Sequence, residues 1–166
     1  LTLQSIPQST LADFAKLRPY DLIIVHYGLN VAVSGNPKNI IQNYARNMGK
    51  VVAHLRQAFP ETSILVFSVP DHEQRGADGI KTLKEVHALV AFQQQMAADK
   101  KVGFYNFFQA MGGEGATRRL VERDMANKDY THLSYGGGKY VADKIYPSFK
   151  AGLKNYQRRI KLESQW

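Results

Sequence analysis

The chain has 166 residues and the composition of one folded domain, with 44% hydrophobic and 22% charged residues. It contains no cysteine, which excludes disulfides, thiolate metal sites and a cysteine nucleophile, and no apolar run approaches the roughly 20 residues of a membrane-spanning helix. The net charge of +8 favours an anionic partner, but the aromatic residues are not interleaved with the basic ones as in a nucleic-acid stacking platform. We therefore expect one domain with no nucleic-acid partner and no transmembrane segment.

The first part of the chain predicts a helix, a strand and a second helix. A helix is expected over residues 9–17, and the nearly continuous apolar run over residues 21–27 is typical of a strand that is covered on both faces. Asn36 and Pro37 then form a helix start signal, and apolar residues recur at helical spacing up to residue 59.

The second part of the chain repeats this alternation. A strand over residues 63–69 precedes a helix that ends near residue 99, for which the segment from Thr82 to Glu85 is a possible capping box. A third strand is expected over residues 102–107. Ser134 is placed to cap a last helix, and the basic residues near the C-terminus are interpreted as a solvated face of that helix.

Alternating helices and strands predict βαβ units, and therefore a parallel sheet with helices on both faces, which is a three-layer α/β/α fold. Three strands make a small sheet for 166 residues, and the chain begins with Leu1 rather than methionine. We therefore expect that one or two strands from the start of the sheet are missing and that the chain comes from a longer protein.

The loop after the first strand contains Gly28 and Asn30. Ligands in parallel sheets bind beside the carboxyl ends of the strands, so this loop is a candidate part of the site. Glycine allows the backbone to turn sharply, and an asparagine amide can donate a hydrogen bond to a developing oxyanion. The alternative is that Asn30 is a turn residue that bonds to its own backbone.

Asp129 and His132 stand three residues apart, just before the last helix. A loop can bring the carboxylate to one ring nitrogen, which fixes the tautomer while the other nitrogen takes a proton. The alternative for so short a pattern is a polar turn that leads to a helix cap.

A Gly-x-Asn at an early strand end and an Asp-x-x-His just before the last helix occur in this order in the SGNH (GDSL) hydrolases. The chain resembles this family over residues 5–149, most closely a subgroup of bacterial cell-envelope enzymes. The resemblance is most specific in four stretches: DLIIVHYGLNVAV (21–33), LRQAFPETSILVFSVPD (55–71), FQAMGGEGA (108–116) and DYTHLSYGGGKYVA (129–142).

The resemblance implies a flavodoxin-like fold and a serine esterase mechanism without a cofactor. It makes His132 the general base, Asp129 its orienting partner, Asn30 an oxyanion-hole residue and Gly28 the residue that shapes the loop. Residues 1–166 would form the C-terminal portion of an SGNH hydrolase-like domain, in a bacterial protein of the periplasm, the cell envelope or the secreted fraction.

Two departures from the family pattern stand out. Val31 replaces the aspartate that often follows the asparagine. More seriously, the family's nucleophile lies in a Gly-Asp-Ser motif near the N-terminus, and this chain has no such motif and no glycine before Gly28. Ser5, Ser9 and Ser34 do not lie at a strand-to-helix turn, which is the position that presents a nucleophile. We therefore expect a companion N-terminal segment to carry the serine.

Other polar residues have smaller expected roles. Ser34, four residues past Asn30, and His72, just after the second strand, are expected to contact substrate. His26 is expected to be a buried, hydrogen-bonded strand residue, whereas His54 and His87 fall at solvated helix positions. The sequence has no pattern of three or four convergent metal ligands, so no metal site is expected.

The resemblance implies a serine ester hydrolase that removes acyl groups, such as acetate, from a carbohydrate or cell-wall glycan. The chain alone, without the serine, is expected to be inactive. The alternative is a non-catalytic SGNH-like domain that binds a glycan or a protein in the same cleft.

Overall fold

The computed structural model of the protein describes residues 2–163. Its main sheet has three parallel strands in the spatial order β1-β2-β5, with the bounds β1 (Leu22–His26), β2 (Ser63–Phe67) and β5 (Gly103–Tyr105). β1 pairs with β2 over its whole length, so that His26 lies opposite Phe67. Because the strands are parallel, their carboxyl ends lie at one edge of the sheet, where the predicted site residues follow.

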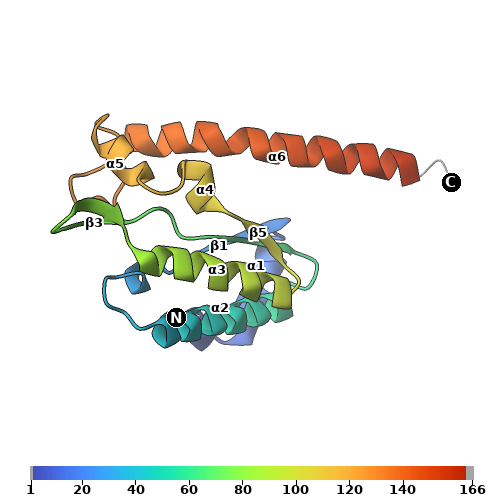
Figure 1. Ribbon diagram of the computed structural model, residues 1–166. Coiled ribbons are helices and arrows are strands. Elements are labelled where there is room, and N and C mark those ends of the chain that lie inside the picture. Colours follow the sequence, from blue (N-terminus) through green and yellow to red (C-terminus); the bar gives the residue numbers. More distant parts are fainter. Residues whose placement is uncertain (1, 164–166) are drawn as a thin grey trace.

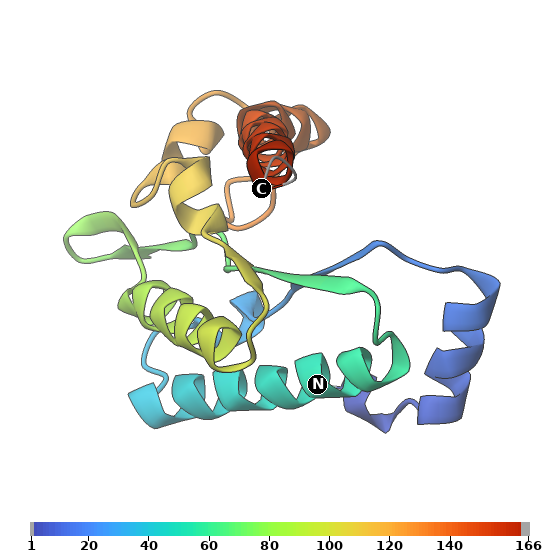
Figure 2. The same ribbon diagram turned by 90° about the vertical axis from the view of Figure 1, so that its right-hand side faces the viewer.

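Helices cover both faces of this sheet, so the predicted three-layer α/β/α fold is confirmed (Figures 1 and 2). One face carries α2 (Lys38–Ala58) and α3 (Lys84–Asp99), and α1 (Gln8–Leu17) packs against α2. The opposite face carries α4 (Phe107–Met111), α5 (Ala116–Val121) and α6 (Tyr135–Glu163). Two short 3-10 helices complete the chain, η1 (Thr2–Ser5) and η2 (Leu29–Val31).

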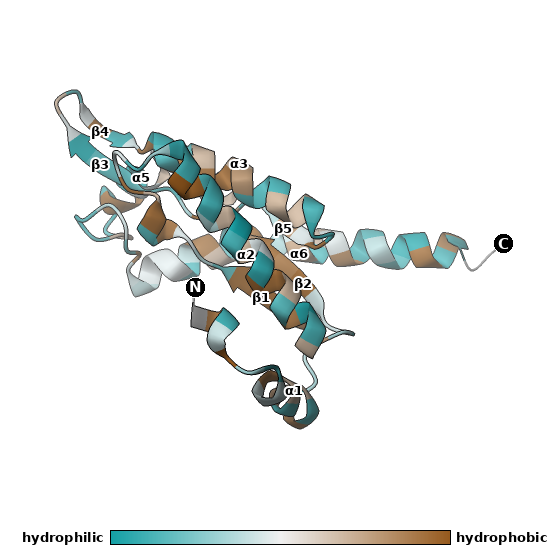
Figure 3. Cartoon of the chain, turned by 90° about the horizontal axis from the view of Figure 1, so that it is seen from below, coloured by the Kyte–Doolittle hydropathy of each residue, from teal (hydrophilic) through white to brown (hydrophobic). Residues whose placement is uncertain are grey.

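The central strand β2 contributes to the hydrophobic cores on both sides of the sheet. Ile64 and Val66 pack towards α2, whereas Leu65 and Phe67 pack towards α4 and α6. This two-sided burial is why the strand reads as a continuous apolar run. Figure 3 shows β1 and β2 as hydrophobic strands and the outer side of α2 as hydrophilic.

The edge strand β1 is covered on one face only. Val25 is 2% exposed and faces α2, whereas Leu22 and Ile24, on the other face, are 44% and 50% exposed. His26 shares this face and is exposed, so the expectation that it is fully buried is wrong, but it has the expected hydrogen bond, with the Ser68 backbone, and partial burial lowers its pKa. Its ring contacts the rings of Phe67 and Phe107. The cause is that α4 and α6 lie over β2 and β5 and leave this part of β1 without a covering layer.

A two-stranded antiparallel hairpin, which the sequence analysis missed, projects beside the carboxyl edge of the sheet. It consists of β3 (Glu73–Gly76) and β4 (Gly79–Thr82), joined by a two-residue loop. The hairpin makes the predicted capping box wrong, because Thr82 ends β4 and its hydroxyl donates to Asp71 at 2.6 Å. α3 therefore begins at Lys84, without a side-chain cap.

The other predicted helix caps have mixed outcomes. Asn36 does not cap α2: its amide donates to the Val31 carbonyl at 2.8 Å, and Pro37 occupies the cap position. Ser134 does cap α6, since its hydroxyl accepts the Gly137 N–H at 3.1 Å. The outcomes differ because the Asn36 side chain bonds to a carbonyl in the loop before the helix, whereas the Ser134 hydroxyl bonds to the first turn of the helix itself.

His54 is not solvated as expected but fastens the N-terminal segment to α2. The amide of Gln8 donates to Nδ1 of His54 at 2.7 Å, so Nε2 carries the hydrogen and donates to the Ile6 carbonyl at 2.8 Å.

Within residues 2–163, no helix is both long and apolar enough to cross a lipid bilayer.

Candidate active site

The loop between α5 and α6 holds Asp129 against His132, as predicted. Asp129 Oδ2 lies 2.8 Å from His132 Nδ1. The other oxygen, Oδ1, accepts the backbone N–H groups of Thr131 at 2.9 Å and of His132 at 3.0 Å. Tyr130, between them, has a φ of 55°, and this left-handed conformation turns the chain back on itself. The carboxylate is therefore fixed by three hydrogen bonds within four residues.

The protonation of this pair follows from its geometry. The hydrogen bond from the His132 side chain, helped by the backbone N–H groups, lowers the pKa of Asp129 to about 2. An ionised carboxylate only accepts hydrogen bonds, so Nδ1 of His132 carries a hydrogen, and in the neutral imidazole Nε2 then has the free lone pair. The His132 side chain is 73% exposed, and its Nε2 bonds to none of residues 2–163. This is the arrangement of a general base that faces an open position.

Backbone contacts on both sides hold the histidine loop in place. Asn127 N–H donates to the His132 carbonyl at 2.8 Å, and Ser134 N–H donates to the Met125 carbonyl at 3.0 Å. Gly137, in the first turn of α6, packs so closely that a Cβ there would lie 1.7 Å from the Met125 carbonyl oxygen. The position of His132 therefore depends on the close approach of α6 to this loop.

Gly28 and Asn30 form the other predicted element, at the end of β1. Gly28 has a φ of 119° and is buried, with a Cβ position 3.0 Å from the Leu89 side chain, so it shapes the turn and does not offer a surface to substrate. Asn30 is exposed on η2. The Asn30 amide has no hydrogen-bond partner within the described part of the chain, so the alternative in which it bonds to its own loop is not found. The side chain that bonds to the backbone of this loop is Asn36, which donates to the Val31 carbonyl.

A cavity of about 400 Å³ lies beside the dyad. It brings together Asp129 and the two residues predicted to contact substrate, Ser34 and His72. The His72 ring donates from Nδ1 to the Ala32 carbonyl at 3.2 Å, and the hairpin and Tyr130 form further parts of the wall. The other predicted site residues, Gly28, Asn30 and His132, are not part of this wall. Nowhere in residues 2–163 do three or more acidic or histidine side chains cluster as metal ligands would.

The sequence analysis missed the buried carboxyl groups behind this cavity. Asp71 Oδ2 accepts the Thr117 N–H at 2.9 Å, and Glu73 Oε2 accepts the Arg118 N–H, so both groups hold the first turn of α5. Burial, with a smaller effect of the neighbouring Asp71, raises the pKa of Glu73. The Asp78-Gly79 dipeptide was the signal that predicts the hairpin on which Glu73 lies.

The parallel α/β/α architecture, with an Asp-His pair before the last helix, is consistent with the fold of SGNH-like hydrolases. No protein-family model and no curated protein matches the sequence. Solved structures do match. A peptidoglycan O-acetylesterase is similar to 89% of this chain, with a TM-score of 0.76 and 23% sequence identity. The match covers 41% of that esterase, so the chain spans about two fifths of its length.

A second solved structure shares the fold more distantly. The periplasmic domain of a lipopolysaccharide acetyltransferase from Salmonella ser. Paratyphi A matches 83% of this chain, with a TM-score of 0.54 and 9% identity, and 60% of that domain is covered. At such identities the likeness establishes the fold.

Proposed function

We propose that this chain is the C-terminal portion of an SGNH-type serine ester hydrolase whose nucleophilic serine lies outside the chain. One observation carries the proposal: Asp129 holds His132 as the tautomer with a free Nε2, exposed beside a cavity, and no described serine bonds to that nitrogen. A general base oriented in this way needs a hydroxyl partner within about 3 Å.

The outer edge of β1 is the place where a companion segment would join. β1 has one neighbour, β2, and exposes Leu22 and Ile24 on the face opposite α2. Folded proteins avoid an open, apolar strand edge because its unpaired backbone groups promote aggregation. An added strand beside β1, followed by a turn at the carboxyl edge, would both close the sheet and bring a serine to His132.

The proposed chemistry uses three residues of this chain. The serine oxygen attacks the ester carbonyl while Nε2 of His132 takes its proton, and Asp129 stabilises the imidazolium that forms. The Asn30 amide, free of other partners, donates to the tetrahedral oxyanion. His132 returns the proton to the leaving alcohol oxygen, and water hydrolyses the acyl-enzyme by the reverse sequence, which restores the serine.

The substrate class we propose is an acylated glycan of the bacterial cell envelope, in the periplasm or outside the cell. The support comes from the two structures of similar fold, which are named for acetyl chemistry on peptidoglycan and on lipopolysaccharide. The cavity beside the dyad is within the size range of small-molecule sites.

The test is hydrolysis of an aryl acetate and of acetylated peptidoglycan by the longer protein that contains this chain together with the sequence before it. We expect His132→Ala to reduce turnover by about 10³-fold or more, because the serine then has no base. His87→Ala, an exposed histidine on α3, is the matched control and should leave turnover unchanged. The isolated 166-residue chain should be inactive.

Two outcomes would contradict the proposal. Unchanged turnover in the His132→Ala protein would exclude the dyad as the catalytic base. A longer protein that lacks a serine beside β1, and is inactive while it still binds an acylated glycan, would show the non-catalytic binding domain instead.

A further inference from the structure

Arg75 places an unpaired positive charge on the wall of the cavity. It lies on β3, where its backbone is paired opposite Ile80, so the hairpin fixes its position. It lines the cavity together with Ser34 and Asp129, and it also lines an adjoining hollow of about 370 Å³ that shares Ser34. Among residues 2–163 its guanidinium has neither an ion-pair nor a hydrogen-bond partner.

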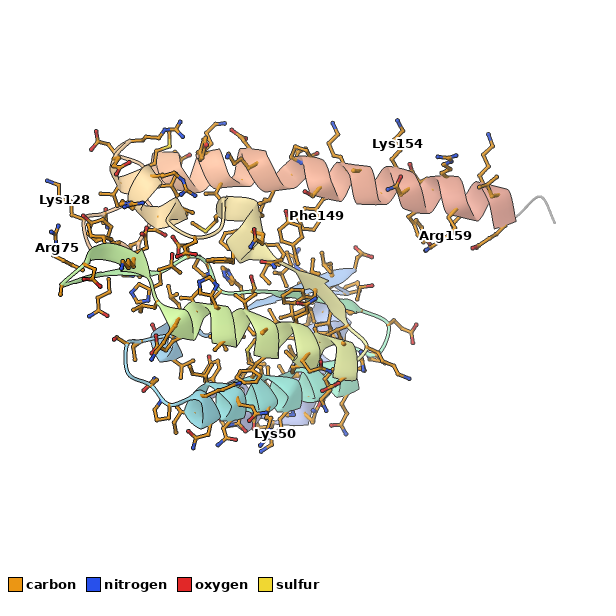
Figure 4. The ribbon with its side chains drawn as sticks, viewed as in Figure 1. Lys50, Arg75, Lys128, Phe149, Lys154 and Arg159 are labelled. Carbon is orange, nitrogen blue, oxygen red and sulfur yellow. The ribbon has the colours of Figure 1, made fainter. Side chains whose placement is uncertain are left out.

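Lys128 is a second cation at the same place. It immediately precedes Asp129, it is exposed, and it too has no ion-pair partner in the described chain. Figure 4 shows Arg75 and Lys128 at the same end of the molecule. The Glu73 N–H donates to the Tyr130 carbonyl at 3.4 Å, which joins β3 to the loop that carries Lys128. Arg75 therefore lines the cavity, and Lys128 lies on the adjoining loop without lining it.

Among residues 2–163, none of the acidic groups around the cavity forms an ion pair with Arg75 or Lys128, and the ionised Asp129 lies on the same wall as Arg75. Both oxygens of Asp129 already accept hydrogen bonds from its own loop. Glu73 is 2% exposed and turned towards α5, and its burial favours the neutral form. Asp78, at the hairpin tip, is 3.5 Å from Lys81. Arg75 and Lys128 thus form no direct ion pair with the acidic groups of the described chain.

We propose that Arg75, assisted by Lys128, binds an anionic group, a carboxylate or a phosphate, on the glycan whose ester is hydrolysed. This inference rests on the proposed function for the glycan and its ester, and it adds that the substrate is negatively charged. The planar guanidinium presents two parallel N–H donors that match the oxygens of either group. The cavity wall then distinguishes anionic from neutral acylated glycans before any bond is broken.

The experiment is calorimetric titration of the 166-residue chain with three probes: an oligogalacturonate for the carboxylate, a glycerol phosphate oligomer for the phosphate, and a neutral chitooligosaccharide. We expect one of the anionic probes to bind at least about tenfold more tightly than the neutral one, because hydrogen bonds to charged groups are the stronger ones. The anionic probe that binds more tightly identifies the bound group as a carboxylate or a phosphate. Added salt should weaken that binding.

Substitutions locate the binding. Arg75→Gln should weaken it by about tenfold or more, and Arg75→Lys, which keeps the charge without the planar fork, by less. Lys50→Gln on α2 removes the same charge from a different part of the surface and should change affinity by less than about twofold (Figure 4). Since the free Arg75 side chain has no bonds to lose, thermal unfolding should be unchanged.

Three results would overturn the inference: equal affinity for the neutral probe, equal losses in Arg75→Gln and Lys50→Gln, or no binding of either anion. None of these measurements needs the nucleophile. If the longer protein proved to have no esterase activity while Arg75-dependent binding persisted, the proposed hydrolysis would fail and the anionic subsite would stand.

Discussion

The loop that carries Asp129 and His132 has partners for its polar groups within the described chain, whereas the outer edge of β1 has no paired strand there. In the loop, Asp129 uses both carboxylate oxygens, and backbone bonds hold the segment on both sides. At the edge of β1, Leu22 and Ile24 are exposed and the strand has a single neighbour. The loop has its hydrogen-bond partners within this chain, whereas we propose that the edge of β1 pairs with a segment outside it. The following predictions test that difference.

The largest effect is expected where α6 meets the histidine loop. Gly137→Ala places a methyl group 1.7 Å from the Met125 carbonyl oxygen, which neither backbone can avoid without moving. We expect a loss of about 3–5 kcal/mol in the free energy of unfolding, measured by denaturant titration. Gly138→Ala is the matched control, since nothing lies within 4 Å of its Cβ position, and it should be neutral or stabilising. Equal losses in the two variants would refute the close packing.

A smaller effect is expected at Asn30, and only in the presence of the companion segment. In the 166-residue chain Asn30→Ala should leave stability unchanged, because the exposed amide has no partner. In the longer protein it should reduce turnover by about 10²-fold, the effect of losing one oxyanion donor. A stability loss in the isolated chain would show instead that Asn30 serves its own loop.

The smallest effect is expected for the pKa of Asp129 in the histidine loop. Since the pKa of Asp129 is lowered to about 2, its hydrogen bonds contribute stability above the ordinary pKa near 4, and this contribution is lost as the pH falls through 2. Carbon-13 NMR of the Asp129 carboxyl should give a midpoint near 2. His132→Ala should raise that midpoint towards the ordinary value, although the backbone donors remain. A midpoint that does not move would assign the shift to another cause.

The sequence predicted the strands, the long helices and the dyad because each depends on neighbouring residues. β2 is apolar because both faces are buried, and three residues suffice to bring Asp129 to His132. The hairpin was missed because Gln74, Arg75 and Lys81 leave no apolar alternation to detect.

Several of the errors share one physical cause, which is a partner from a distant part of the chain. Thr82 has cap chemistry but donates to Asp71, and Glu85 accepts the Gly35 N–H at 2.9 Å rather than completing a capping box. His26 reads as buried because its strand is apolar, but exposure depends on which layers cover β1.

The long helix α6 has a further consequence for how the protein unfolds. Phe149 stacks on Phe67 and Tyr105, and beyond it the helix extends away from the sheet (Figure 1), with Leu153 and Tyr156 57% and 53% exposed. Isolated helices of about 12–15 residues are only marginally stable in water. The amide hydrogens after Phe149 should therefore exchange with solvent through local fraying, whereas those before it should exchange only through global unfolding. Phe149 marks the end of the cooperative unit.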